Sequence, residues 1–459
     1  MCEQDLLAAI NHTRRGNTIA NQHRKPATSL TSRLAGYVVG SLNTTGVGFV
    51  RKMTTVERHA ELVYAESLFE KALLGIIYSG DWLAFIKEAL NMRTTISIYR
   101  LLGRFLDTVD SEATARGAGP IDSSIDVHFR SGVYLGVGVS NLILSLMPSG
   151  LLTIVELFGY KGDRSAGLAA LAKAGGWTSE SDEPAVGAGE EGVRRSICDM
   201  TLLIFHLVLS SFTFDGVDLS MAQKILTWNL KRYPSGVFFL FGAGRLSLVR
   251  GQPRRAIEYY TQATAVQNQY RNLHFISSWE IAIANLALWD IRASLVCWRD
   301  LQAEATWSKA TYTYGTAVCL LELGSGAEAE ELMIRVPELR KRIAGKSIPL
   351  EKFVARKARK FRAQGNWLVL PALEFGYFFR SIAYSPREVV VGRLLPEVER
   401  ALKEVKEREG EGGYWDDLCL VYFLLGVCLR YIAYPVCLHI FLSLVTIILV
   451  GPGCDRGWR

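Results

Sequence analysis

The stretch that decides the fold runs from Gly236 to Asn268 and has the sequence GVFFLFGAGRLSLVRGQPRRAIEYYTQATAVQN. Its pattern is that of two helices joined by a short turn. Gly244 and Ala256 are small residues, placed where the two helices must approach closely, and Gly251 lies in the turn, where a left-handed backbone is cheap only for glycine. The apolar face that one helix pair cannot bury alone is supplied by Leu240, Tyr260 and Ala263.

This pattern recurs along the chain. Ala222, Ala256 and Ala293 are 34 and 37 residues apart. The copy before the best one has Pro234, which ends its second helix because proline lacks the amide donor. The later copies are degenerate and contain Ile281, Ala284, Ala293 and Cys297, and then Gly315, Val318, Ala327 and Glu331. The period predicts an all-α fold, a tetratricopeptide-like helical repeat array or α-solenoid, which is normally a protein-binding scaffold. The alternative is an ordinary helical domain with small residues placed by chance.

Composition places the chain among globular proteins. It has 459 residues, of which 49% are hydrophobic and 21% charged, with a net charge of +7. No alternating strand pattern bounded by turn residues is present. The eight cysteines lack CxxC spacing and the seven histidines are isolated, so there is no zinc signature. GxxxxGK[ST] and GxSxG are also absent. We therefore predict a non-enzymatic protein without cofactor or metal, with His206 as a satisfied core histidine.

The changes in composition along the chain predict its organisation. We expect a mobile N-terminal tail over residues 1–32, an N-terminal helical region over 33–172, a flexible linker over 173–193, tetratricopeptide-like repeats over 194–435 and an apolar, atypical tail over 436–459. Residues 432–450 carry no formal charge. This uncharged stretch is long enough for a membrane anchor. The alternatives are a buried capping helix and a sequence that results from a truncated or mis-spliced gene model.

The basic residues concentrate in one stretch. Residues 335–362 contain eleven Lys and Arg residues against Glu338 and Glu351. Part of this stretch, residues 353–361, has the pattern of a basic amphipathic helix, and its candidate patch residues are Arg356, Lys357, Arg359 and Lys360. They predict either a solvated helix face or a patch for an acidic partner or an anionic membrane surface. Since no aromatic residues interleave with them in a nucleic-acid motif, nucleic acid is not expected as a partner.

A partner groove is expected along the first helices of the pairs. Large aromatic residues and arginine there would be natural anchors for a bound segment. The candidate groove residues are Phe238, Phe241, Arg245, Tyr270, His274, Trp279, Tyr312 and Tyr314. The alternative is that most of them belong to the core between repeats. A further hypothesis is a lipid-handling protein that uses the apolar region 125–158 as a cavity.

Several blocks resemble a known family. They are YAESLFEKALL at 64–74, DVHFRSGVY at 126–134, NLILSLMP at 141–148, FGYKGD at 158–163 and YPSGVFFLFGAGR at 233–245. Over about residues 33–435 the chain resembles the inclusion body clearance protein family, which is related to the animal tetratricopeptide repeat protein 39 group. The chain departs from the family's pattern after Pro435, where more polar sequence and another helix pair are expected.

The resemblance implies a non-enzymatic intracellular adaptor. Such a protein would help to clear misfolded-protein inclusions after folding stress, with lipid-droplet proteins among its partners. It would lie in cytoplasm and nucleus, with some association with the mitochondrial outer membrane. The alternative function is a membrane-associated tether at that membrane, held by residues 432–450 or by the basic helix near 353–361.

Overall fold

The structure is a computed structural model and describes residues 3–25, 43–79, 82–147, 161–343 and 346–432. The predicted apolar tail over 436–459 lies outside these residues. The chain divides into two compact units, Met1–Asn229 and Leu230–Arg459, so the boundary falls inside helix α10. Among the described residues only two short strands accompany the helices, which confirms the all-α prediction.

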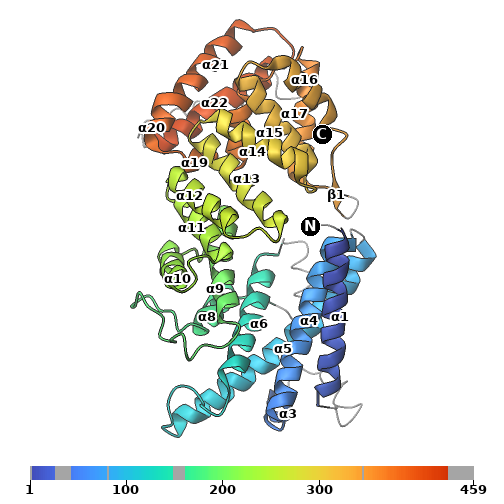
Figure 1. Ribbon diagram of the computed structural model, residues 1–459, viewed down its shortest axis with the longest axis vertical. Coiled ribbons are helices and arrows are strands. Elements are labelled where there is room, and N and C mark those ends of the chain that lie inside the picture. Colours follow the sequence, from blue (N-terminus) through green and yellow to red (C-terminus); the bar gives the residue numbers. More distant parts are fainter. Residues whose placement is uncertain (1–2, 26–42, 80–81, 148–160, 344–345, 433–459) are drawn as a thin grey trace. The chain divides into compact units, whose positions relative to one another are not determined.

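The first unit is a set of helices in which neighbours along the chain pack together: α4 against α5, α5 against α6, and α6 against α8. Its elements, shown from blue to green in Figure 1, are α1 (Glu3–His23), α3 (Asn43–Arg51), α4 (Thr55–Ser79), α5 (Trp82–Ala115), α6 (Val127–Ser145), α8 (Arg164–Lys173), α9 (Arg195–Leu203), the π-helix η1 (Ile204–Val208), the 3₁₀-helix η2 (Leu209–Ser211) and α10 (Leu219–Arg232).

The predicted mobile tail over residues 1–32 is wrong for the part that is described. Residues 3–23 form α1, which packs along α4. Leu6, Ile10 and Ala20 are buried, and Asn17 donates a hydrogen bond to the Ser67 hydroxyl at 3.1 Å. The polar composition was misleading because α1 buries one narrow apolar face and leaves its other sides in solvent.

The predicted flexible linker over residues 173–193 is a loop held on the first unit. It connects α8 and α9, and the backbone amides of Ala185 and Val186 donate to the carbonyls of Gly176 and Gly175 at 3.1 Å each. Trp177 is buried, and its indole N–H donates to Asp199 at 2.7 Å. A glycine-rich composition therefore marks tight turns here rather than a free connection.

Close packing fills the face of α6 where a lipid cavity was considered. A Cβ atom on Gly136 would lie 2.0 Å from the ring of Tyr99, and one on Gly138 would lie 2.5 Å from Leu171. The described part of this helix is therefore in direct contact with α5 and α8. Residues 148–158 of the same region lie outside the described residues.

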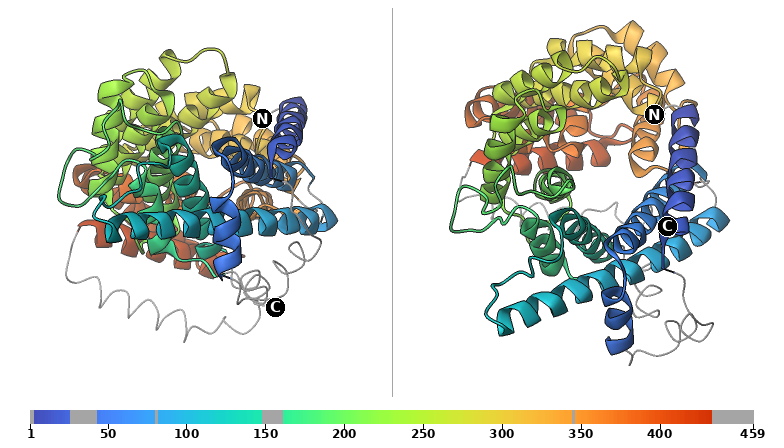
Figure 2. Two further views of the ribbon diagram at one scale, coloured as in Figure 1. Left: turned by 90° about the horizontal axis from the view of Figure 1, so that it is seen from below. Right: turned by 60° about the horizontal axis from the view of Figure 1, so that its bottom comes forward.

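The second unit continues with helices that pack in sequence order from α11 to α17. Figure 2 shows α11 to α16 side by side in a row. The elements are α11 (Val237–Val249), α12 (Pro253–Ala265), α13 (Arg271–Ala287), α14 (Ile291–Glu304), α15 (Lys309–Glu322), α16 (Gly326–Arg335), the antiparallel strands β1 (Arg342–Ile343) and β2 (Lys346–Ser347), α17 (Pro349–Ala363), α18 (Pro371–Phe378), α19 (Ser381–Tyr384), α20 (Arg387–Val389), the π-helix η3 (Val390–Leu394), α21 (Leu395–Glu407) and α22 (Tyr414–Ile432).

The small residues of the repeats lie at the fourth position of each second helix. In α10, α12, α14 and α16 these fully buried residues are Ala222, Ala256, Ser294 and Ala329. The predicted positions were shifted in the two degenerate copies. Ala293 is only half-buried, and its amide donates a hydrogen bond to the capping carboxylate of Asp290 at 3.0 Å, while Ala327 is exposed. Small-residue spacing alone could not choose between neighbouring positions, because serine also fits a close helix contact.

The other repeat positions lie at turns and close contacts. Gly251 has a φ of +70° in the turn between α11 and α12. A Cβ on Gly244 would lie 2.4 Å from the ring of Tyr260, and one on Gly315 would lie 2.8 Å from Trp298. Ala263 is buried on the same helix as Tyr260, and Pro234 follows the end of α10 by two residues.

Candidate partner-binding site

The inner surface predicted as a partner groove is covered by the protein's own chain. α18 packs against α15 and α13, and α19 packs against α13 and α11. These are the first helices of the pairs, whose side chains were expected to line an open groove. Every residue of α15 from Ala310 to Leu320 is buried. The predicted groove residues therefore divide into a buried set and an exposed set.

Arg245 belongs to the buried set and is part of an internal ion pair. Its guanidinium donates to Glu280 on α13 at 2.8 Å and to the Tyr384 hydroxyl on α19 at 3.3 Å. Burial alone would lower the pKa of Arg245, but the Glu280 carboxylate outweighs it and raises that pKa, so the side chain stays charged. Arg245 joins α11, α13 and α19 and has no surface on which to receive a partner.

The predicted groove residues Trp279, Tyr312 and Tyr314 belong to an aromatic core. The ring centroid of Trp279 lies 5.6 Å from that of Tyr312 and 4.9 Å from that of Phe379. Tyr314 is fully buried, with its ring centroid 5.4 Å from that of Phe375 on α18. Burial raises the pKa of Tyr312 to about 12. Edge-to-face contacts of this kind stabilise a core in addition to the apolar area they bury.

Phe241 and His274 are also directed to the protein itself. The ring centroid of Phe241 lies 5.4 Å from that of Tyr260. His274 is half-buried and its imidazole contacts the carbonyl oxygen of Gln267 in the preceding loop. Neither side chain is positioned as an open anchor.

The exposed set lies at the starts of the first helices. Phe238 on α11 is 57% exposed and Tyr270, which precedes α13, is 38% exposed. Trp307, which precedes α15, is 42% exposed, and Lys341 lies over its ring at 4.4 Å. Because α11, α13 and α15 are alternate helices of one antiparallel row, their starts share an edge. We call Phe238, Tyr270 and Trp307 the aromatic edge.

Trp307 was missed by the sequence analysis. It lies in the polar stretch Gln302–Lys309, outside any helical period, so no repeat position pointed to it. The available signal was a tryptophan flanked directly by the polar residues Thr306 and Ser308. Such a residue has no reason to be buried and is a natural surface anchor.

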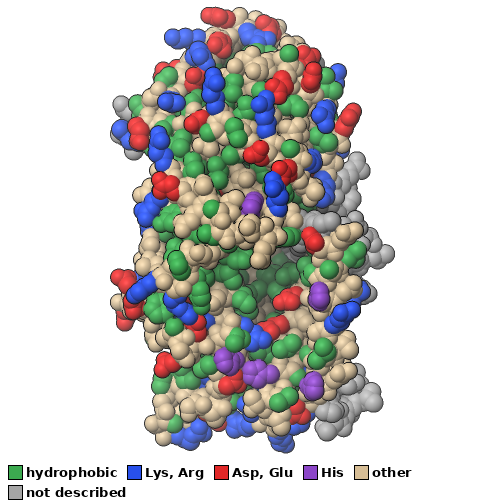
Figure 3. Space-filling model, in the orientation of Figure 1, with side chains coloured by type: hydrophobic (Ala, Val, Ile, Leu, Met, Phe, Trp, Pro, Cys, Tyr) green, Lys and Arg blue, Asp and Glu red, His purple; other side chains and the backbone are tan. Residues whose placement is uncertain are grey.

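The predicted basic patch on α17 also divides into two sets. Lys357 pairs with Glu374 at 2.5 Å, and Lys360 pairs with Asp416 and Asp417 at 2.7 and 2.8 Å. These lysines hold α17 to α18 and α22. Arg356 and Arg359 are exposed and, among the described residues, make no ion pair within 4 Å. Figure 3 shows Lys and Arg mixed with Asp and Glu on the visible face of this unit, so that face carries no extended patch of one charge.

Cys319, Cys428 and His206 could carry chemistry, but all three are buried. Burial raises the pKa of the Cys319 and Cys428 thiols to about 12 each, which keeps them protonated. His206 accepts a hydrogen bond from the Asp218 amide at 3.0 Å, and burial lowers the pKa of His206 to about 4. Within the ranges that the structure describes, no cluster of His, Cys, Asp and Glu has the geometry of a metal site. No described helix is both long and apolar enough to cross a membrane.

Comparison with known proteins identifies the family of this chain. The chain is 32% identical over 393 residues to tetratricopeptide repeat protein ttc-39B of Caenorhabditis elegans. The aligned region covers 83% of this chain and 64% of the relative, so the chain spans less than two thirds of the relative's length. The family model described as Iml2/tetratricopeptide repeat protein 39 matches residues 2–432, nearly the whole chain. The chain belongs to the Iml2/tetratricopeptide repeat protein 39 family.

Proposed function

We propose that the protein is a non-enzymatic adaptor that helps to clear misfolded-protein inclusions after folding stress, acting in cytoplasm and nucleus with lipid-droplet proteins among its partners. Two kinds of observation support this role. The chain is a helical-repeat protein of the Iml2/tetratricopeptide repeat protein 39 family. Cys319 and His206 are buried in protonation states that suit packing rather than nucleophilic or acid–base chemistry.

The aromatic edge is the observation that carries the proposal. Phe238, Tyr270 and Trp307 expose large rings, whereas Trp298, Tyr314 and Phe375 of the same unit are buried in one core. Tyrosine and tryptophan are the residue types that most often anchor protein interfaces, because they bury a large area at small cost in side-chain entropy. We propose that a partner segment docks along this edge, outside the inner surface that α18 and α19 cover.

The test is inclusion clearance in cells. Cells that lack the protein receive either the wild-type chain or the Phe238→Ser/Tyr270→Ser/Trp307→Ser variant, and a fluorescent aggregated reporter is followed after heat stress. We expect the wild-type chain to restore clearance and the edge variant to fail while keeping a normal melting curve. Clearance at the wild-type rate by the edge variant would contradict the assignment of the edge.

A control variant is available on the second helices. Val296 on α14 and Ile334 on α16 are 60% and 44% exposed, so Val296→Ser/Ile334→Ser removes exposed apolar side chains elsewhere on the same unit. This control should restore clearance fully. If cells without the protein clear the reporter normally, the inclusion-clearance role itself is wrong.

The second candidate function is a membrane-associated tether at the mitochondrial outer membrane, and the observation that favours it is on α17. Lys352, Arg356 and Arg359 are exposed and lie three or four residues apart, so they form one cationic stripe. Lys357 and Lys360 must stay unchanged in a test, because they hold internal ion pairs. We expect Lys352→Glu/Arg356→Glu/Arg359→Glu to abolish sedimentation with anionic vesicles; sedimentation equal to that of wild type would end this candidate.

A further inference from the structure

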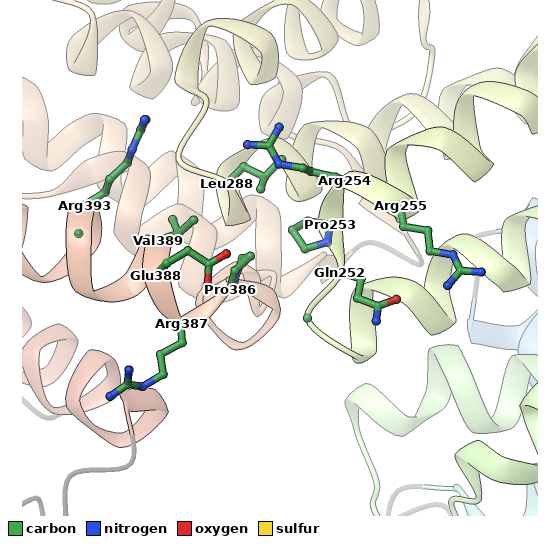
Figure 4. A pocket seen from close by; sticks show the side chains of 12 residues that line it. Gln252, Pro253, Arg254, Arg255, Leu288, Pro386, Arg387, Glu388, Val389 and Arg393 are labelled. Atoms are coloured by element: carbon green, nitrogen blue, oxygen red, sulfur yellow. The ribbon is translucent and has the colours of Figure 1, made fainter.

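A groove in the second unit gathers four arginines around an apolar floor. It has a volume of about 840 Å³ and lies between the turn that joins α11 to α12, the end of α13, and the segment from Pro386 to η3. Figure 4 shows the floor and the surrounding arginines, which come from segments more than a hundred residues apart in the sequence. The floor is formed by Pro253, Leu288, Pro386 and Val389.

The arginines around this floor are available to a ligand. They are Arg254 and Arg255 at the start of α12, Arg387 at the start of α20, and Arg393 in η3, and all are exposed. Arg254, Arg387 and Arg393 have no ion-pair partner among the described residues, whereas Arg255 lies over the Tyr259 ring. Glu388 is the single acidic residue that lines the groove. Like charges that line one groove repel one another, and a bound anion would relieve this repulsion.

Both walls of the groove are anchored to the core. Gly251 at the α11–α12 turn has a φ of +70°, and the Gln252 amide donates to the Ser247 carbonyl at 2.9 Å. On the opposite wall, Val390 and Leu394 are buried while Gly392 and Arg393 between them face outward. This wall is a π-helix, a distortion that recurs at functional sites and costs helical stability. Anchored walls lower the entropy lost when a ligand binds.

We propose that this groove, which we call the arginine groove, binds an extended acidic peptide segment of a partner protein. The guanidinium fork matches a carboxylate in a bidentate way, and several such groups along one groove suit a run of Asp and Glu side chains. The aliphatic floor would contact the peptide between its charges. A nucleic acid fits less well, because the groove lining has no aromatic ring on which bases stack.

This site goes beyond the proposed adaptor function and is separate from the aromatic edge. Its lining residues lie at the opposite ends of α11 and α13, near Gly251 and Leu288, whereas Phe238 and Tyr270 lie at their starts. Failure of the arginine groove would leave the inclusion-clearance test unaffected, and failure of that test would leave the groove unaffected.

The experiment measures fluorescence anisotropy of a labelled poly-glutamate peptide with the full chain at an ionic strength of about 0.15 M. We expect saturable binding that weakens with salt, and none to a poly-glutamine peptide of equal length. Arg254→Glu/Arg393→Glu should weaken binding by about tenfold or more. The matched control is Arg292→Glu/Arg335→Glu, which reverses two exposed, unpaired arginines on α14 and α16 and should change affinity by less than about twofold.

The Glu388→Gln variant distinguishes a specific effect on peptide binding from a loss of binding that is caused by unfolding. Removing this carboxylate should strengthen peptide binding by about two- to threefold, a gain that a destabilised chain cannot produce. The proposal is overturned if poly-glutamate does not bind, if the control pair weakens binding as much as Arg254→Glu/Arg393→Glu does, or if poly-glutamine binds equally well. It is also overturned if a single-stranded oligonucleotide or inorganic phosphate displaces the peptide at lower concentration than unlabelled poly-glutamate does.

Discussion

The first and second helices of the repeat pairs differ in what covers them. The first helices α11, α13 and α15 pack against their neighbours in the row and also against α18 or α19. The second helices α12, α14 and α16 leave one face in solvent, and α16 buries only Ala329 and Met333. A helix that is apolar on every side is an internal helix. The inner surface of this array is therefore structural, and the two binding sites that we propose lie at its edges and turns.

The largest expected effect is the difference in stability loss between a substitution in the aromatic core and one on a solvent-exposed helix face. Trp298 is fully buried between α13, α15 and α18, so Trp298→Ala should lower the free energy of unfolding by about 3–5 kcal/mol. Val296, two residues away on the solvent side of α14, should change it by less than about 0.5 kcal/mol when replaced by alanine. Urea unfolding measures both values. Similar losses of stability for the two variants would contradict the assignment of Trp298 to the buried face of α14 and of Val296 to its exposed face.

The internal ion pair tests whether α11 is a closed helix. Arg245→Met leaves the Glu280 carboxylate buried without its partner, and we expect a loss of about 3 kcal/mol. The double variant Arg245→Met/Glu280→Leu should recover most of that loss, because neither charge remains. If Arg245 instead served an open groove, its replacement would weaken partner capture and leave the urea midpoint unchanged.

The register of the second helices can be tested with two alanines on α16. Ala329 is fully buried, so Ala329→Leu should overpack the contact with α15 and cost about 1–3 kcal/mol. Ala327 is exposed, and Ala327→Leu should stay within about 0.5 kcal/mol of wild type. Thermal unfolding compares them directly. If Ala327→Leu lowered the stability more than Ala329→Leu did, the register predicted from Ala327 would be the correct one.

The smallest expected effect is opposite pH dependence in the two units. Burial lowers the pKa of His206 to about 4, so its contribution in the first unit is lost as pH falls from about 6.5 to about 4. Burial, together with the nearby Glu397 carboxylate, raises the pKa of Glu322 to about 7, although the hydrogen bond from the Ala372 amide opposes this shift. Its contribution in the second unit is present below about pH 4.5 and is lost as pH rises to about 7.

Amide hydrogen exchange separates these two contributions, because protection is measured for each helix. Between pH 4.5 and 6.5, after correction for intrinsic exchange rates, protection of η1 should rise with pH while that of α15 falls. Glu322→Gln should remove the fall in α15 and leave the rise in η1. The same trend in both helices, or no effect of Glu322→Gln, would show that other groups control the pH response.

The repeat array was predictable because its signal is local. Gly244, Gly251 and Ala256 serve one helix pair within a single stretch, and the distances between them follow from helix length and turn geometry. The prediction weakened where the contact residue changed type, as at Ser294. It failed for α1, whose few apolar residues, Leu6, Ile10 and Ala20, do not stand out from a polar background.

The candidate site was less predictable because its residues depend on distant segments. Arg245, Tyr312 and Tyr314 have the composition of interface anchors, but α18 and α19 cover them from more than fifty residues away in the sequence. Lys357 and Lys360 likewise resemble a free patch until Glu374 and Asp417 are placed beside them. The residue type determines what a side chain can bind, but it does not determine which segment of the folded chain contacts that side chain.

The sequence by itself determined the all-α class, the repeat period and the family, because helical period, turn glycines and close-contact residues act over one or two turns of chain. Only the tertiary structure decided that α18 and α19 close the inner surface, that the aromatic edge stays open, and that Arg254 and Arg393 line one groove. The physical reason is that burial and ion pairing depend on which segments meet in space, and those segments are far apart along the chain.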